Sequence, residues 1–215
     1  MRWNLEKSYL TELAARGAPV PASAIVEADA AVLAGALERM ALTEAVIKPT
    51  VGASGVGVER VWRGREAEAL ARLRAVTRSP RVLVQEFVPE VAAGEIAGVF
   101  LGGAFSHGLR RVPAAGEFRV NSQYGGRMEA AALDHATIVS MTRLLSMLPN
   151  EPLYARIDGV RRNGGLLLME VEVNEPGLGL DLVAGAAERF ADTVIARLSS
   201  PAARPQQYGT DVHRV

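Results

Sequence analysis

The stretch that decides the fold of this chain is Leu166-Leu-Leu-Met-Glu-Val-Glu-Val-Asn-Glu-Pro176. Side chains of a β-strand alternate between its two faces. One predicted face therefore holds Leu166, Leu168, Glu170, Glu172 and Asn174. This face changes from apolar to acidic along its length, which predicts a strand that begins in a core and ends in a polar site. The alternative is an edge strand whose acidic face is solvated.

The segment before this stretch predicts its partner strand. Residues 154–160 alternate like a strand, and the Arg-Arg-Asn-Gly-Gly that follows is typical of a hairpin turn. A two-residue turn would place Asp158 opposite Met169, on the wrong face. We therefore expect a three-residue turn at 163–165, because it places Asp158 opposite Glu170.

Opposed acids on paired strands repel each other, and the same register places Arg156 opposite Glu172. Two carboxylates about 4 Å apart, at an effective dielectric constant of about 20, cost roughly 4 kcal/mol. A bound cation removes this cost, and carboxylate oxygens suit a Mg²⁺ ion that also contacts phosphates. The even spacing from Asp158 to Glu170 therefore favours a metal site on the hairpin.

Length and composition bound the class of protein. The 215 residues can form one large domain or two small ones, and 49% hydrophobic with 22% charged residues is ordinary for a globular protein. Lys plus Arg and Asp plus Glu number 24 each, so we expect neither a nucleic-acid partner nor a membrane surface. The lack of cysteine excludes disulfides, thiolate catalysis and Cys-ligated zinc. With no signal-peptide pattern and no apolar run of about 20 residues, a cytoplasmic location is expected.

Periodicity and capping signals predict the remaining elements. Helices are expected over 5–16, with Asn4 as N-cap and Gly17 past the end, and over 29–40, 65–77, 133–148 and 180–198. Strands are expected over 45–48, 57–62, 81–87, 96–101 and 104–112, and Pro19 and Pro21 indicate an extended linker. We expect leading helices in 1–40, one subdomain over 41–88, a second over 89–199 and a frayed tail over 200–215.

A glycine-rich turn connects the first two of these strands and reads Val46-Ile-Lys-Pro-Thr-Val-Gly-Ala-Ser-Gly-Val-Gly-Val58. Gly52, Gly55 and Gly57 allow successive backbone N–H groups to point at a phosphate, and Lys48 supplies positive charge. No Gly-Lys-Ser/Thr follows, so this is not a Walker loop, and a hairpin follows the glycines, so it is not a dinucleotide fingerprint. The alternative is an ordinary glycine turn.

Together, the glycine-rich turn and the acidic hairpin resemble the ATP-grasp superfamily, in its glutathione synthetase-like and cycloserine-ligase-like branch. The resemblance rests on nine short blocks that occur in the family's order, at 3–10, 47–55, 84–89, 94–95, 105–113, 116–119, 125–127, 155–158 and 169–176. It implies an α+β fold in which two α+β subdomains hold ATP between them. The lid subdomain would be 41–88, and the catalytic subdomain would be 89–199.

This resemblance implies an ATP site that spans both subdomains. Lys7 and Lys48 would contact the phosphates, and Glu95 would face the ribose. The residues of the lid loop that fold over the phosphates would be Gly52, Ser54, Gly55 and Gly57. The hinge residues whose backbone reads adenine would include Gln85, Glu86, Phe87 and Val88. For Lys7, the alternative is a solvated lysine on a helix.

The resemblance also implies the metal and the chemistry. Two Mg²⁺ ions would be held by Asp158, Glu170 and Glu172, although glutathione synthetases carry Asn at the place of Glu172. The catalytic residues would be Lys48, Arg111 and Arg119. Arg119 would stabilise the transferred phosphoryl group, and its alternative is a surface arginine on a strand. The implied reaction uses ATP to join a small-molecule carboxylate and an amine through an acyl phosphate.

The chain departs from the family pattern at its N-terminus. Relatives normally carry a whole domain ahead of the Asn-x-x-Lys helix, and Met1 lies almost on that helix here. We therefore expect a complete nucleotide site and an incomplete acceptor site, which a homo-oligomer or a partner protein would complete. A second hypothesis is an ATP-binding module without ligase activity of its own, acting with a partner or as a sensor. The acceptor stays open, and His107 is expected to be structural.

Overall fold

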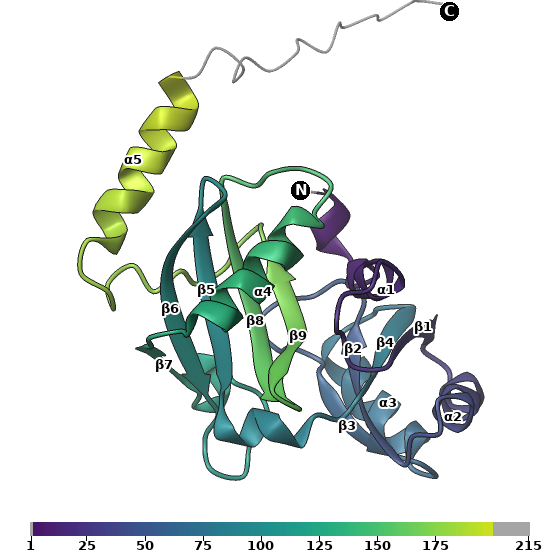
Figure 1. Cartoon of the computed structure of the whole chain (residues 1–215). Coiled ribbons are helices and arrows are strands. Elements are labelled where there is room, and N and C mark those ends of the chain that lie inside the picture. The colour runs from purple at the N-terminus through teal and green to yellow at the C-terminus, as the bar shows by residue number, and fades with distance from the viewer. Residues whose placement is uncertain (1, 200–215) are drawn as a thin grey trace, which may run out of the picture.

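The computed structural model describes residues 2–199, which form two antiparallel sheets lying side by side (Figure 1). The first sheet has the order β1-β4-β2-β3 and consists of β1 (Ser23–Glu27), β2 (Glu44–Pro49), β3 (Glu59–Trp62) and β4 (Arg81–Glu86). The second has the order β7-β6-β5-β8-β9 and consists of β5 (Glu95–Leu101), β6 (Ala104–Val112), β7 (Arg127–Ala130), β8 (Tyr154–Arg162) and β9 (Gly165–Glu172). With the helices described below, this arrangement confirms the expected α+β class.

Two helices, α2 (Ala30–Arg39) and α3 (Glu66–Val76), pack against the first sheet (Figure 1). Asp29 caps α2 as expected, since its carboxylate accepts hydrogen bonds from the backbone N–H groups of Ala31 and Val32. The apolar stripes of both helices meet alternate side chains of the strands. The large side chains of this buried core are Leu33, Leu37, Ile47, Val61, Leu70, Leu73, Val82 and Val84.

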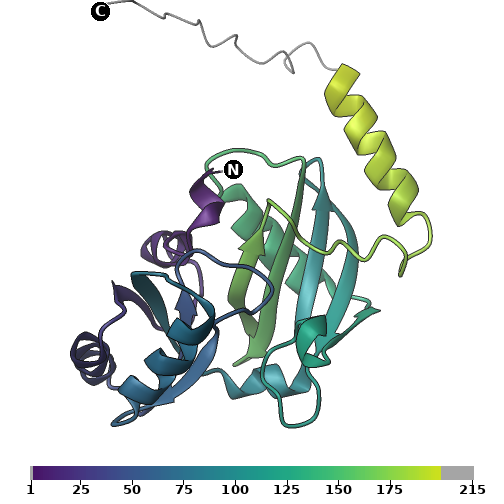
Figure 2. The same cartoon turned by 180° about the vertical axis from the view of Figure 1, so that it is seen from behind.

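Helix α4 (His135–Ser146) covers one face of the second sheet, and α5 (Ala186–Ser199) extends away from the other face beside β5 and β6 (Figures 1 and 2). The core beneath α4 also receives α1 (Tyr9–Ala15) and Leu83 of the first sheet. The two sheets therefore share a packed boundary. The cavity described below opens along it.

Several predicted boundaries are wrong. The first helix begins at Tyr9, because Arg2–Leu5 forms a separate 3₁₀ turn, η1, and Asn4 is not its N-cap. The segment after Pro21, expected to be a linker, contains β1, which pairs with β4, so the first sheet begins upstream of residue 41. The last helix begins at Ala186 rather than at 180. The predicted tail, 200–215, lies outside the described residues.

The turn of the β8–β9 hairpin differs from the prediction. Arg162 pairs with Gly165, so the turn has two residues, Asn163 and Gly164, and the expected three-residue turn is wrong. Both turn residues have positive φ, +52° and +77°. Two consecutive residues with positive φ form the tight turn that matches the twist of paired strands, and Asn-Gly is its preferred sequence.

A β-bulge nevertheless restores the predicted register. Gly159 pairs with Leu168, whereas the next pair is Asp158 with Glu170. Met169 is therefore an extra residue on β9. A Cβ on Gly159 would lie 2.6 Å from the Leu167 carbonyl oxygen, so glycine permits the close approach at this irregularity.

The bulge also changes which side chains share a face, because one extra residue shifts the alternation by one. Leu166 and Leu168 lie in the core under α4 together with Val171 and Val173. Glu170 and Glu172 point to the other side, into the cavity. The expectation that Leu166, Leu168, Glu170 and Glu172 share one face is therefore wrong.

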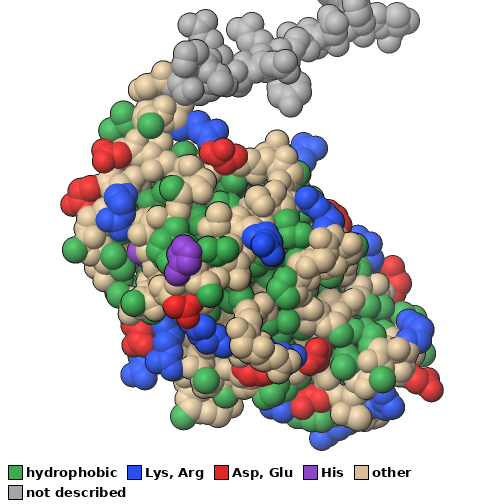
Figure 3. All heavy atoms as spheres, viewed as in Figure 1, with side chains coloured by type: hydrophobic (Ala, Val, Ile, Leu, Met, Phe, Trp, Pro, Cys, Tyr) green, Lys and Arg blue, Asp and Glu red, His purple; other side chains and the backbone are tan. Residues whose placement is uncertain are grey.

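Charge on the surface is mixed in sign. Figure 3 shows Lys and Arg interspersed with Asp and Glu over the face that carries α4. This pattern agrees with the equal totals of the two charges, 24 each. Among the described residues, no helix is both long enough and apolar enough to cross a membrane.

Candidate nucleotide and metal site

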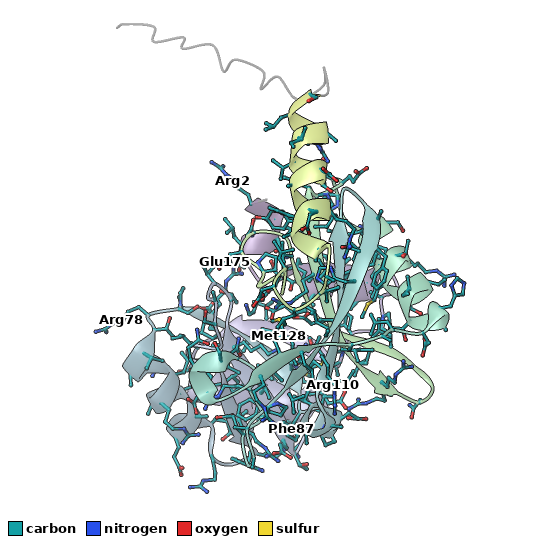
Figure 4. The ribbon with its side chains drawn as sticks, turned by 90° about the vertical axis from the view of Figure 1, so that its left-hand side faces the viewer. Arg2, Arg78, Phe87, Arg110, Met128 and Glu175 are labelled. Carbon is teal, nitrogen blue, oxygen red and sulfur yellow. The ribbon has the colours of Figure 1, made fainter. Side chains whose placement is uncertain are left out.

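A cavity of about 270 Å³ lies between the two sheets and collects most of the predicted site residues. Those on its wall are Lys7, Lys48, Gly52, Ser54, Gly55, Gln85, Glu86, Phe87, Val88, Glu95, Arg111, Arg119, Glu170 and Glu172. Gly57 and Asp158 are not on the wall. Two lining residues, Phe87 just after β4 and Glu175 after β9, lie well apart in Figure 4.

Three acids converge at this cavity. One carboxylate oxygen from each of Asp158, Glu170 and Glu172 lies within 4.8 Å of the other two. Asp158 has no exposed surface, and it accepts hydrogen bonds from Arg156 Nε at 2.8 Å and from Arg111 Nη1 at 2.6 Å. The two arginines thus hold Asp158 behind the wall, while the two glutamates face the cavity.

Burial and neighbouring charges together set the pKa values of these acids. Burial, reinforced by the neighbouring Glu170, raises the pKa of Glu172 to about 8. Burial alone would also raise the pKa of Asp158, but Arg156 and Arg111 outweigh it and lower that pKa. A cation at the cluster would favour the charged form of Glu172. Three converging carboxylates are an all-oxygen donor set, which fits Mg²⁺.

Two lysines approach the acids from the side of the glycine-rich loop. Lys7 Nζ lies 3.3 Å from the Glu170 carboxylate and donates a hydrogen bond to the Gly52 carbonyl at 2.9 Å. Lys48 Nζ donates to Gln85 Oε1 at 2.8 Å, and burial lowers the pKa of Lys48. Burial would raise the pKa of Glu170, but Lys7 and Lys48 outweigh it and lower that pKa. Lys7 is therefore not a solvated helix lysine.

The glycine-rich loop extends from the first sheet toward β9 (Figure 2). Side chains from the connection between β6 and β7 form hydrogen bonds with this loop. The Tyr124 hydroxyl donates to the Gly55 carbonyl at 3.2 Å, and Arg119 Nη1 donates to the Val58 carbonyl at 3.4 Å. Gly55 has φ of +72°, and a Cβ there would lie 2.7 Å from Asn121 Oδ1. The positive φ favours glycine at this position, and a Cβ there would also require the Asn121 side chain to move.

The hinge between the sheets forms another wall. Phe87 and Val88 connect β4, which ends at Glu86, to the 3₁₀ turn η2 (Pro89–Ala93). The guanidinium carbon of Arg60 lies 3.8 Å from the centre of the Phe87 ring. Glu95, at the start of β5, accepts a hydrogen bond from Arg111 Nη1 at 3.3 Å, and burial raises the pKa of Glu95 to about 7.

Arg119 lies in the connection between β6 and β7, so it is not the surface arginine of a strand. Its Nε and Nη2 atoms donate to Glu117 at 3.1 and 2.7 Å. Its guanidinium carbon lies 3.6 Å from the centre of the Tyr124 ring. The glutamate and the ring together orient the arginine at the cavity wall beside the glycine-rich loop.

Sequence reasoning located Arg156 but did not assign it to the site. Only 3% of Arg156 is exposed, and it also contacts Glu172 at 2.5 Å and donates to the Gly177 carbonyl at 2.9 Å. Its alternation with Asp158 in Tyr-Ala-Arg-Ile-Asp was the available signal, because both side chains lie on one strand face. Asn4 was also missed, since its side chain bonds the backbone of Val171 and Val173.

His107 has the surroundings of a structural residue. It is buried, with one ring nitrogen 2.9 Å from Ser106 Oγ and the other 2.8 Å from the Leu178 carbonyl oxygen. Both ring nitrogens therefore have partners within the protein. The expectation of a structural role agrees with this position.

Comparison with known proteins identifies the family. The family model described as prokaryotic glutathione synthetase, ATP-grasp domain, matches residues 13–181. The chain belongs to this ATP-grasp family. The resemblance inferred from the nine sequence blocks is confirmed, and so is the ATP-grasp fold.

Relatives of this ATP-grasp chain include two curated proteins and a solved structure. It is 30% identical over 216 residues to the cycloserine biosynthesis protein DcsG of Streptomyces lavendulae, covering 92% of this chain and 71% of that protein. It is 34% identical over 160 residues to a glutathione synthetase of Parasynechococcus marenigrum, and the match covers 73% of this chain and 50% of that protein. The crystal structure of D-cycloserine synthetase DcsG matches with a TM-score of 0.78 and 27% identity, and the match covers 92% of this chain and 71% of that one. The ATP-grasp chain thus belongs to a family of ligases and spans half to about 70% of these relatives.

Proposed function

We propose that this ATP-grasp chain binds Mg·ATP between its sheets and activates a carboxylate as an acyl phosphate for attack by an amine. The observation that carries the proposal is the convergence of three acids, two lysines and a glycine-rich loop at one cavity. Phosphoryl transfer needs oxygen ligands for Mg²⁺, cations near the phosphates and backbone N–H donors. The ligase names of the relatives support the same reaction class.

The nucleotide would lie along the cavity from the hinge to the acid cluster. Adenine would rest against residues 86–88, and the ribose would lie near Glu95. The triphosphate would then reach Lys7 and Lys48 beneath the glycine-rich loop. We place the triphosphate there because both lysines are close enough to Glu170 to lower its pKa. Phosphate oxygens bound beside Glu170 would therefore be within reach of the same two positive charges.

The acids would hold two magnesium ions, with Glu170 and Glu172 at the cavity and Asp158 behind them. Bound Mg²⁺ would neutralise charge on the transferring phosphoryl group. Protein residues would contribute position and charge: Lys48 at the phosphates, and Arg111 and Arg119 at the reacting end. Catalysis of this type needs no covalent residue, in agreement with the absence of cysteine.

The proposed reaction has two steps. A carboxylate oxygen of the first substrate attacks the γ-phosphorus, and ADP leaves. The amine nitrogen of the second substrate then attacks the acyl carbon, inorganic phosphate leaves, and the amine loses a proton to solvent. The glycine-rich loop would keep water from the acyl phosphate between the steps.

The test is ADP release, measured over a panel of carboxylates and amines with and without Mg²⁺. We expect release to require Mg²⁺, a carboxylate and an amine together, and to be abolished in Glu170→Gln. Glu129→Gln is the matched control, because Glu129 is exposed and forms a surface ion pair with Arg110. Release that is equal in both variants would contradict the proposal.

A second candidate is an ATP-binding module that acts with a partner or as a sensor. The acids, lysines and glycine-rich loop at the cavity would serve such a module equally well, and the chain spans 71% of one relative and 50% of the other. In this candidate, a second copy of the chain or a partner protein would take part in binding the acceptor. Mg·ATP binding without ADP release for any substrate pair would favour this candidate.

A further inference from the structure

The hinge that joins the two sheets is held from both sides. It runs from Glu86, the last residue of β4, to Pro89, the first residue of η2. On the side of the first sheet, Arg60 lies over the Phe87 ring at 3.8 Å. On the side of the second sheet, Arg162 at the end of β8 contacts the acids that flank the hinge.

Arg162 binds both ends of the hinge at once. Its Nε and Nη2 atoms donate to the two carboxylate oxygens of Glu90 at 2.7 and 2.9 Å. Its Nη1 atom donates to Glu86 Oε1 at 2.7 Å. A bidentate pair with a carboxylate fixes orientation as well as distance, which a single contact cannot do. The Arg162 side chain is 21% exposed and those of Glu86 and Glu90 are 31% and 34% exposed, so solvent screens these contacts in part.

The same strand carries the acid cluster. Asp158 and Arg162 both belong to β8, four residues and roughly 13 Å apart. Between Asp158 and Arg162, β8 pairs with β9, whereas its pairing with β5 ends at Gly159 and a bulge lies between Asp158 and Gly159. Because both residues belong to one hydrogen-bonded strand, β8 links the position of the hinge to the position of the acids.

We propose that Arg162 is a positioning residue, which holds the hinge at the distance from the acid cluster that a bound nucleoside triphosphate needs. This inference rests on the proposed function, because it assumes that the hinge meets the base while the acids meet the metal and phosphates. Arg162 does not line the cavity and acts through Glu86 and Glu90. Its loss should therefore weaken recognition of the base and leave recognition of the phosphates intact.

The size of the effect follows from hinge populations. The apparent dissociation constant equals the intrinsic constant divided by the fraction of molecules whose hinge is in the binding conformation. If loss of Arg162 reduces that fraction to a tenth, Mg·ATP binds about tenfold more weakly. A ligand that contacts only the lysines and the glycine-rich loop would not be affected.

The neighbouring residue provides a matched control. Arg161 is on the same strand and also forms an ion pair, with Asp134 at 2.5 Å. That pair lies on the outside of the protein, and its side chains are 55% and 51% exposed. Arg161→Gln and Arg162→Gln therefore remove the same charge from adjacent positions, and only one of them contacts the hinge.

The experiment measures Mg·ATP affinity by calorimetry, and Mg·tripolyphosphate affinity by competition against Mg·ATP. We expect Arg162→Gln to weaken Mg·ATP about tenfold with little change for Mg·tripolyphosphate, and Arg161→Gln to change neither. Glu90→Gln removes the bidentate contact and keeps Arg162, so it should give a smaller loss of the same selectivity. Arg162→Lys should restore part of the affinity, since lysine keeps the charge without the fork.

The outcomes separate the inference from the proposed function. If wild type binds no Mg·ATP, the proposed function fails, and this inference fails with it. If wild type binds Mg·ATP and Arg162→Gln matches Arg161→Gln, only the inference is overturned. Equal losses of Mg·ATP and Mg·tripolyphosphate in folded Arg162→Gln, judged by its melting temperature, would also overturn it.

Discussion

Asp158 and Glu172 carry the same charge, yet their surroundings suit them to different tasks. Asp158 is completely buried, and two arginines donate to it. The Glu172 side chain is 28% exposed and faces the cavity. Glu172 can therefore approach a metal with little rearrangement, whereas Asp158 also keeps the buried arginines neutralised.

We predict that Asp158→Asn destabilises the fold by about 3–5 kcal/mol, because it leaves Arg111 and Arg156 buried without their shared partner. Urea unfolding measures the change. Glu129→Gln is the control, since Glu129 pairs with Arg110 at the surface and its loss should cost less than about 1 kcal/mol. Equal losses in the two variants would contradict the structural part assigned to Asp158.

We also predict that Mg·ATP stabilises the protein far more than ATP with chelator does. At a ligand concentration a hundredfold above the dissociation constant, linkage gives about 2.7 kcal/mol, which is visible in thermal melting. Glu170→Gln should remove the magnesium-dependent part, because it removes a ligand charge and keeps the shape. Identical melting shifts in wild type and variant would exclude Glu170 as a metal ligand.

Glu117 supplies a prediction about pH. The hydrogen bond from Arg119 lowers the pKa of Glu117 to about 2 from its ordinary value of 4.5. A lowered pKa in the folded state stabilises the protein above the ordinary value, and this stability is lost as the pH falls from 4.5 toward 2. The melting temperature of wild type should exceed that of Glu117→Gln at pH 6, and the gap should narrow at pH 2.5. A gap that stays constant with pH would contradict the pairing.

At the scale of elements, the glycine-rich loop and the β6–β7 connection work as a pair. The loop comes from the first sheet, and Tyr124 and Arg119 from the second sheet bond its carbonyl groups. Closure of the loop over a nucleotide would therefore depend on how closely these two segments approach. Gly55 lies at a close approach, because a Cβ there would be 2.7 Å from Asn121 Oδ1 and 3.1 Å from Tyr124.

We predict that Gly55→Ala weakens Mg·ATP binding about tenfold or more, since a residue other than glycine at positive φ costs roughly 1–2 kcal/mol and its Cβ would also meet Asn121. Stability should change less than binding does, because Gly55 lies in a loop outside the core. Gly52→Ala is the matched control: Gly52 does not have positive φ, and the nearest atom to its Cβ would be 3.6 Å away. Equal affinities in the two variants would contradict the close approach.

At the scale of the whole molecule, the cavity belongs to neither sheet alone. Its wall takes Lys48 and Gln85 from the first sheet, and Glu95 and Glu170 from the second. Ligand that binds at such a boundary stabilises one relative position of the two sheets. Arg162 holds the hinge that joins the two sheets, and this contact restricts how the sheets can move relative to each other.

We predict that Mg·ATP protects residues 50–58 from hydrogen exchange. In the proposed complex the loop N–H groups bond phosphate oxygens, and closure excludes water. Hydrogen-exchange mass spectrometry with and without Mg·ATP measures the change. Helix α2 is the internal control, because it packs in the core of the first sheet and none of its residues lines the cavity. Unchanged exchange at 50–58 would count against both the lid and the phosphate contact of Lys48.

Local chemistry in the sequence was enough to predict much of this protein. Asp29 predicted the start of α2, and the glycine-rich turn and the acidic hairpin led to the α+β ATP-grasp fold. The predicted pairing of Asp158 with Glu170 is also correct. These features depend on residue periods, caps and turn preferences, which act over a few residues and can be read along the chain.

Only the tertiary structure decided the details that hold the site. The bulge at Met169 depends on the close packing of β8 and β9 around Gly159, so the strand pattern predicted the wrong shared face. Arg162 meets Glu90 across 72 residues of sequence, and Asn4 meets Val171 across 167. Contacts between such distant segments leave no periodic pattern in the sequence, because each end satisfies its own local rules, and folding alone brings the partners together.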